Sequence, residues 1–193
     1  PQTFNFDGLE REYLLYIPEN TVPNASLVFV LHGYTGTAQG IMGYSGMNEV
    51  AAENGFVVCY PQGTTDQYDN TFFNVDYAFQ NNPVVDDVGF IVALAEYLQT
   101  THELSSVNTF STGMSNGGDM SYRLACEASS TFRAIAPVAG LIMQDIYDSC
   151  NPENPVPLFE THGTDDDVSW YEGDPFNDDG WGVYLDIPST IDF

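Results

Sequence analysis

The stretch from residue 107 to residue 123 constrains the fold more than any other part of this sequence. It begins with a β-branched and aromatic run, turns through a glycine-rich corner and continues with helix-compatible residues. The corner, Gly113-Met114-Ser115-Asn116-Gly117, has the G-x-S-x-G pattern of a serine held on a sharp strand-to-helix turn. Glycines suit such a turn because neighbours with a Cβ would crowd the strained backbone. The pentapeptide alone is a weak signal, but the strand before it and the helix after it indicate that Ser115 is a nucleophile.

The remaining segments predict an α/β fold with a mostly parallel sheet. At 193 residues the chain suits a single domain, residues 1–193, and no internal repeat suggests a second. Two continuous apolar runs are typical of strands buried on both faces, and strands alternate with helical patterns. Besides the elbow strand and helix, we expect strands at 3–6, 10–17, 26–31, 56–60, 132–138 and 156–160, helices at 46–54 and 86–100, and an aromatic loop at 62–83.

The charge balance excludes several classes of partner. The chain has 28 acidic residues against three basic ones, a net charge of −25. Nucleic acids and anionic membranes carry phosphate, so neither is an expected partner. No segment approaches the roughly 20 apolar residues of a membrane span. The chain opens at Pro1 rather than Met, which we interpret as a processed or trimmed start.

Three cysteines bear on the cellular compartment. Cys59 lies in an apolar run and is expected to be a buried thiol. Cys126 follows the elbow helix, and Cys150 lies in a polar loop. A disulfide between these two would imply an exported protein, whereas two free thiols are the alternative that the spacing leaves open.

Acyl transfer by a serine also requires donors for the oxyanion. One expected donor is the backbone N–H of Asn116, the residue after the nucleophile. The second should come from the early loop that begins at His32, where Tyr34 is the candidate and Thr35 the neighbouring option. We interpret His32 as a residue that shapes this loop rather than as the base.

A candidate acid follows the last expected strand. Asp165, Asp166 and Asp167 lie in one loop downstream of Ser115, in the Ser-then-Asp order of α/β-hydrolases. A calcium loop is the alternative, but the spacing of the carboxylates does not support it, and Asp167 suits a solvated turn. The predicted chemistry needs neither a metal nor an organic cofactor.

Several motifs together carry a family resemblance, and they span most of the chain in a consistent order. On these motifs the chain resembles the polyhydroxybutyrate depolymerase and feruloyl esterase group of α/β-hydrolases, carbohydrate esterase family 1. The motifs are Leu31-His32-Gly33, Asp86-Asp87-Val88-Gly89-Phe90-Ile91, Gly113-Met114-Ser115-Asn116-Gly117-Gly118, Tyr122-Arg123-Leu124-Ala125-Cys126-Glu127, Ala136-Pro137-Val138-Ala139-Gly140 and His162-Gly163-Thr164-x-Asp166.

The resemblance implies an α/β-hydrolase fold with helices on both faces of the sheet. It makes Ser115 the nucleophile and Asp166 the acid of a catalytic triad, with His162 as a structural residue. It also implies a disulfide between Cys126 and Cys150, and an exported enzyme.

The sequence departs from the family at the catalytic base. The family histidine lies well beyond the acid, after a last strand, but this chain has only His32, His102 and His162. Residues 188–193 resemble the start of the helix before that strand, so the last strand and helix are expected to be missing. A fragment, a second chain that supplies the histidine, or a protein that is not a working hydrolase would each explain this; the first is favoured.

The resulting hypothesis is a secreted serine carboxylic-ester hydrolase. Its expected substrates are feruloyl or acetyl esters of plant polysaccharide, or short aliphatic polyesters, and a peptidase is a further possibility. Aromatic residues between 68 and 79, and the Trp170-Tyr171 pair, could stack on a ring or could simply bury a loop. The alternative from another class is a non-catalytic carbohydrate- or partner-binding protein on a hydrolase scaffold.

Overall fold

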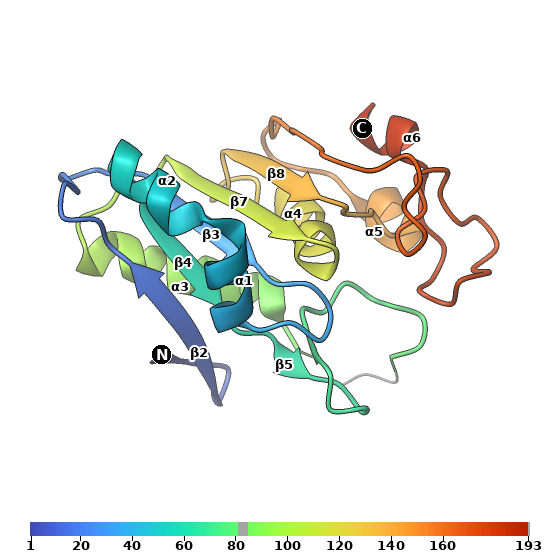
Figure 1. The fold of residues 1–193 in the computed structure, drawn as a ribbon, viewed down its shortest axis with the longest axis horizontal. Coiled ribbons are helices and arrows are strands. Elements are labelled where there is room, and N and C mark those ends of the chain that lie inside the picture. Colours follow the sequence, from blue (N-terminus) through green and yellow to red (C-terminus); the bar gives the residue numbers. More distant parts are fainter. Residues whose placement is uncertain (81–84, 193) are drawn as a thin grey trace.

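A computed structural model describes residues 1–80 and 85–192. Their main sheet has six strands in the order β1-β2-β4-β3-β7-β8, and a second sheet pairs β5 with β6. β1, β2 and β4 pair antiparallel in turn, whereas β4, β3, β7 and β8 run parallel (Figure 1). The strands are β1 (Gln2–Phe6), β2 (Leu9–Tyr16), β3 (Leu27–Leu31), β4 (Val57–Pro61), β5 (Thr64–Thr65), β6 (Thr71–Phe72), β7 (Thr109–Met114) and β8 (Ala134–Val138). The helices are α1 (Ala38–Ser45), α2 (Met47–Asn54), α3 (Asp87–Thr101), α4 (Asn116–Glu127), α5 (Gln144–Ser149) and α6 (Ile187–Ile191).

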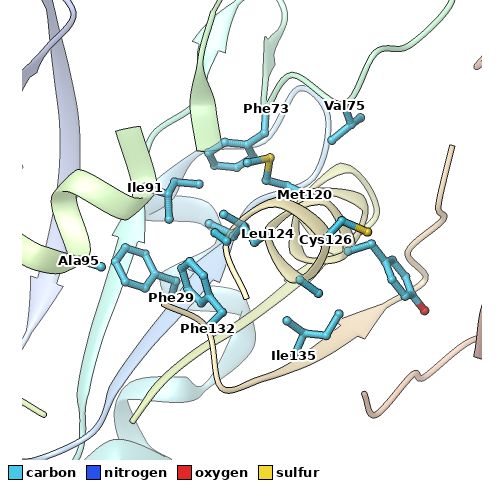
Figure 2. Packing of buried hydrophobic residues seen from close by; sticks show 14 of the residues in the cluster. Phe29, Phe73, Val75, Ile91, Ala95, Met120, Leu124, Cys126, Phe132 and Ile135 are labelled. Carbon is cyan, nitrogen blue, oxygen red and sulfur yellow. The ribbon is translucent and has the colours of Figure 1, made fainter. Parts of the chain in front are cut away.

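Helices cover both faces of the parallel strands, as predicted. Successive side chains of a strand point to opposite faces, so Phe29 and Val30 enter different cores. α3 and α4 cover the Phe29 face, where Phe29 meets Phe132 edge-on at 5.7 Å and Leu124 of α4 packs beside them (Figure 2). α1 and α2 cover the Val30 face with the buried Ile41 and other small apolar residues (Figure 1).

The amino-terminal hairpin and the buried strands follow their sequence signals. Asp7 and Gly8 form the turn between β1 and β2 with φ of 49° and 77°. Two positive φ angles give a turn whose twist matches that of the flanking strands, which explains the Asp-Gly pair. Every residue of β4 is buried, as expected for a central strand.

Four short elements, α1, α5, β5 and β6, were not predicted, and one predicted strand does not form as a continuous strand. α1 was not expected because two glycines weaken its helical propensity, but Thr37 caps it by accepting a hydrogen bond from the Gly40 N–H. The strand predicted at 156–160 is wrong in extent: the segment joins β8 only through isolated bridges from Leu158 and Thr161. Between these bridges, Pro137 of β8 lacks the N–H that would donate to the Phe159 carbonyl in a continuous parallel ladder.

From Thr161 onward the chain gathers beyond the carboxyl end of β8 (Figure 1), after residues 154–158 have run back alongside that strand. A disulfide between Cys126 and Cys150 joins the end of α4 to the end of α5, and Cys59 is a buried free thiol. The last residues of the predicted loop, 81–83, and Phe193 lie outside the described residues. Among the helices described, none has the length and hydropathy to cross a membrane.

Candidate active site

Ser115 is the single residue between β7 and α4, and its backbone is strained. Its φ of 53° and ψ of −123° lie where residues with a side chain rarely occur. The Ser115 N–H donates to the Val138 carbonyl at 2.9 Å, and its carbonyl accepts from the Asp119 N–H at 2.9 Å. These two bonds hold the serine at the carboxyl edge of the sheet, directly before the start of a helix.

The glycines around Ser115 allow backbones to approach closely. A Cβ on Gly113 would lie 2.5 Å from the Gly117 backbone, and one on Gly117 would lie 2.3 Å from the Leu31 carbonyl oxygen. One on Gly118 would meet the Gly140 Cα at 2.9 Å. Real Cβ contacts are not this short, so the geometry of the corner requires glycine at these positions.

The early loop lies beside the serine. A Cβ on Gly33 would be 3.5 Å from the Ser115 Cβ, which places this loop next to the nucleophile. The Thr35 N–H already donates to the Thr71 carbonyl at 2.8 Å, so Tyr34 is the better candidate for the second oxyanion donor. The Asn116 N–H belongs to the first turn of α4, where N–H groups lack acceptors within the helix. The oxyanion roles of Tyr34 and Asn116 remain predictions.

The Asn116 side chain has a second role that the sequence did not indicate. It is fully buried, and its Oδ1 accepts from the Phe73 N–H at 2.7 Å. Its Nδ2 donates to the Phe73 carbonyl at 2.9 Å. The residue after the nucleophile therefore fixes the backbone of the aromatic loop, 43 positions away in the sequence.

His32 shapes the loop around it. Its Nδ1 donates to the Gly33 carbonyl at 2.8 Å, and its Nε2 accepts from the Gly63 N–H at 3.0 Å. Burial lowers the pKa of His32, in keeping with a neutral ring that donates through one nitrogen and accepts through the other. With both nitrogens engaged, this imidazole matches the structural role expected for it.

The acid loop follows the segment that bridges to β8. The Ala139 N–H donates to the Thr161 carbonyl at 2.8 Å, which brings the loop to the same edge of the sheet as Ser115. Asp166 Oδ1 accepts from the N–H groups of Val168 at 2.9 Å and Ser169 at 2.8 Å. Its side chain is 22% exposed and so remains accessible. Asp166 as the triad acid stays a prediction.

His162 is buried within this loop. Its Nδ1 lies 3.1 Å from Glu160 Oε1, and its Nε2 lies 2.7 Å from the Ser169 carbonyl oxygen. Burial opposes a charge on the ring, but hydrogen bonds to Glu160 and Ser169, together with the nearby carboxylates, outweigh it and raise the pKa of His162. Both nitrogens face acceptors, so this ring is not arranged to take a proton from Ser115.

His102 lies near the amino ends of the parallel strands, far from Ser115 at their carboxyl ends. It ends α3, and the neighbouring Glu103 carbonyl accepts from the Asn24 N–H, just before β3, at 2.8 Å. Ser115 stands at the other end of these parallel strands. The described residues therefore assemble a nucleophile, an oxyanion side and an acid loop, and no histidine of this sequence is placed as their base. The described part of the chain also contains no cluster of three or more potential metal ligands.

A strained serine at the end of a parallel strand, with a helix starting behind it, defines the α/β-hydrolase class. A solved structure of an acetyl xylan esterase from Aspergillus awamori supports this fold, with a TM-score of 0.58 and 22% sequence identity. The match covers 74% of this chain and 52% of that one. The predicted fold class is confirmed.

The sequence comparisons identify the family. The family model for esterase PHB depolymerase matches residues 11–152, so the chain belongs to that family. Feruloyl esterase C of Emericella nidulans is 29% identical over 84% of this chain and 57% of its own length. A bifunctional acetylxylan esterase/xylanase of Neocallimastix patriciarum is 26% identical over 86% of this chain and 23% of its own length. The chain thus spans 57% of the length of the first of these relatives and 23% of the second. The family resemblance inferred from the motifs is confirmed.

Proposed function

We propose that the protein is a serine carboxylic-ester hydrolase with Ser115 as its nucleophile. The observation that carries this proposal is the positive φ of Ser115 at the start of α4, beside the Gly33-Tyr34 loop. Strain of this kind persists only where surrounding structure enforces it, and it clusters at functional sites. Both curated relatives named above are esterases, which points to esters rather than peptides.

The reaction follows from the groups around this serine. Ser115 Oγ attacks the ester carbonyl and gives its proton to an imidazole, while the N–H groups of Asn116 and Tyr34 stabilise the oxyanion. The imidazolium then protonates the leaving alcohol, and the acyl group remains on Ser115. Water, deprotonated by the same imidazole, releases the acid and restores the serine. Asp166 orients this imidazole, which comes from outside these 193 residues, on the same or on a second chain.

Feruloyl or acetyl esters of plant polysaccharide are the proposed substrates, with short aliphatic polyesters as the wider class. The names of the relatives support this choice. Partly exposed rings of Tyr34, Phe79 and Trp181 meet near the early loop, with centroids 5.4 to 5.7 Å apart. Such rings offer an edge against which an aromatic acyl group or a sugar could pack.

We also propose that the enzyme is exported. The Cys126–Cys150 disulfide supports this, because disulfides persist in oxidising compartments.

Added imidazole tests the proposed reaction in the chain as it stands. Wild-type and Ser115→Ala proteins are assayed on methyl ferulate, 4-nitrophenyl acetate and a matched amide, with and without imidazole in solution. We expect ester turnover by the wild type that rises with imidazole, and only the solution background for Ser115→Ala. Equal rates for the two proteins would reject Ser115 as the nucleophile. If neither protein exceeds the background while both bind feruloylated xylan oligosaccharides equally, the non-catalytic binding protein is the correct reading.

A further inference from the structure

A carboxylate is buried one turn beyond the nucleophile. Asp119 of α4 is 3% exposed, and each of its oxygens accepts a short hydrogen bond from a different loop. Oδ2 accepts from the Tyr77 hydroxyl at 2.5 Å, and Oδ1 accepts from the Leu141 N–H at 2.6 Å. One side chain therefore joins the nucleophile helix to the aromatic loop and to the loop after β8.

The Tyr77 bond leads to the oxyanion side. The Tyr77 ring lies 5.1 Å from the Trp181 ring, is stacked on Phe79 at 5.6 Å and meets Tyr34 edge-on at 6.3 Å. Tyr34 carries the proposed second oxyanion donor. A shift of the Tyr77 ring would therefore be passed to the residue that has to hold the oxyanion, because packed rings move together.

The Leu141 bond leads back to Ser115. Leu141 directly follows Gly140, which packs against Gly118 of α4, and the same loop begins at Val138. The Val138 carbonyl accepts the Ser115 N–H. Asp119 thus supports the two loops that flank the serine from within the helix that presents it.

Burial disfavours the ionised form of Asp119. Burial raises the pKa of Asp119 to about 7, although the hydrogen bonds from Tyr77 and Leu141 act in the opposite direction. Glu160 raises the value further and His162 lowers it, and Tyr122 also faces the carboxylate. Because this pKa lies above that of an unfolded aspartate, ionisation removes stability as the pH rises from about 4 to about 7. The carboxylate therefore holds two loops through its hydrogen bonds while its own burial disfavours the charge.

We infer that Asp119 is a positioning residue that holds the oxyanion loop and the β8 loop against the nucleophile helix. It acts through Tyr77 and Leu141 and does not touch the substrate. The inference rests on the proposed function, because the oxyanion loop has a catalytic meaning only in an esterase.

The first test needs no turnover. Trp181 emission reports on Tyr77, and a Trp170→Phe background leaves Trp181 as the only tryptophan. We expect the emission to change with a midpoint near pH 7 and the change to be absent in Asp119→Asn. Tyr77→Phe, which removes the donor and keeps the ring, should also flatten the titration. Asp76→Asn changes an exposed carboxylate of the same loop and should leave it intact. An unaltered titration in both Asp119→Asn and Tyr77→Phe would overturn the inference.

The second test separates positioning from general stability. In the imidazole-assisted assay, Asp119→Asn and Tyr77→Phe should lower kcat by about 10- to 100-fold, with KM changed by less than about threefold, because a displaced oxyanion donor acts on the transition state. Unchanged kcat in both variants, with only a lower Tm, would overturn the inference. If the wild type turns over no ester, the proposed function fails, and the fluorescence titration alone decides whether Asp119 positions the loop.

Discussion

The candidate site has two sides that are built differently. The oxyanion side comprises the early loop from His32 to Thr35 and the start of α4 at Asn116, and the acid side is the loop that carries Asp166. On the oxyanion side, buried polar groups hold each loop to a neighbouring element: the Asn116 side chain binds the Phe73 backbone, and His32 binds the Gly63 N–H. On the acid side, Asp166 accepts from N–H groups of its own loop, at Val168 and Ser169. That loop follows a segment joined to β8 only by isolated bridges.

The hydrogen bonds that hold the proposed oxyanion donors in place do not involve the acid loop. The bonds from Asn116 and His32 connect loops to elements that fold around one mostly parallel sheet. Electrostatic stabilisation of an oxyanion is often the largest single contribution to catalysis. On the acid side, none of the three histidines of this sequence is placed as a base for the proposed acid Asp166.

The largest expected effect comes from the acid side. Asp166→Asn should lower the rate of imidazole-assisted ester hydrolysis by up to about 10³-fold. The reason is that a triad acid orients the imidazole and balances its charge. The asparagine oxygen can still accept from Val168 and Ser169, so the loop itself should persist. Asp165→Asn is the matched control, since Asp165 is exposed and adjacent. Equal rates for the two variants in steady-state assays would remove Asp166 from the triad.

The second prediction concerns the two hydrogen bonds between the Asn116 side chain and the Phe73 backbone on the oxyanion side. Asn116→Ala removes two buried hydrogen bonds and leaves both backbone groups of Phe73 without partners. The free energy of unfolding should fall by about 2 kcal/mol, measured by urea denaturation. Asn54→Ala, at an exposed position of α2, should change it by less than about 0.5 kcal/mol. If Asn116→Ala is as stable as Asn54→Ala, the hydrogen bonds from Asn116 to Phe73 do not stabilise the oxyanion side, and the contrast with the acid side is lost.

The third prediction concerns the backbone strain at Ser115, which lies between the oxyanion side and the acid side. Ser115→Gly should raise the free energy of unfolding by about 1 kcal/mol relative to Ser115→Ala, because glycine accepts the positive φ that alanine does not. Both variants lack the hydroxyl, so the comparison isolates the backbone. Equal or lower stability of the glycine variant in thermal unfolding would show that no strain is stored at this corner.

The sequence predicted the parts of the site that depend on local pattern. The corner at Ser115 could be found because its glycines and its flanking strand and helix lie within a few residues of one another. The roles of the Asn116 side chain and of Asp119 could not be found, because their partners Phe73, Tyr77 and Leu141 come from loops with no periodic signal. The strands were predicted where burial produced apolar runs. The prediction was wrong at 156–160, where Pro137 of the neighbouring strand β8 lacks the N–H that continuous pairing needs.

The smallest expected effect is a pH dependence on the acid side. The pKa of His162 is raised in the folded protein, so the stability that its charged form contributes is fully present below pH 6.5, its ordinary value. This contribution is lost as the pH rises through the higher, folded pKa. His162→Gln should therefore narrow the difference in free energy of unfolding between pH 5.5 and pH 8.5, as measured by urea denaturation at both values. His102→Gln, near the amino ends of the parallel strands, is the matched control and should keep the wild-type difference. A His162→Gln protein with that same difference would show that the Glu160–His162 pair does not hold the acid loop through its charge, and the two sides of the site would then differ less than the structure indicates.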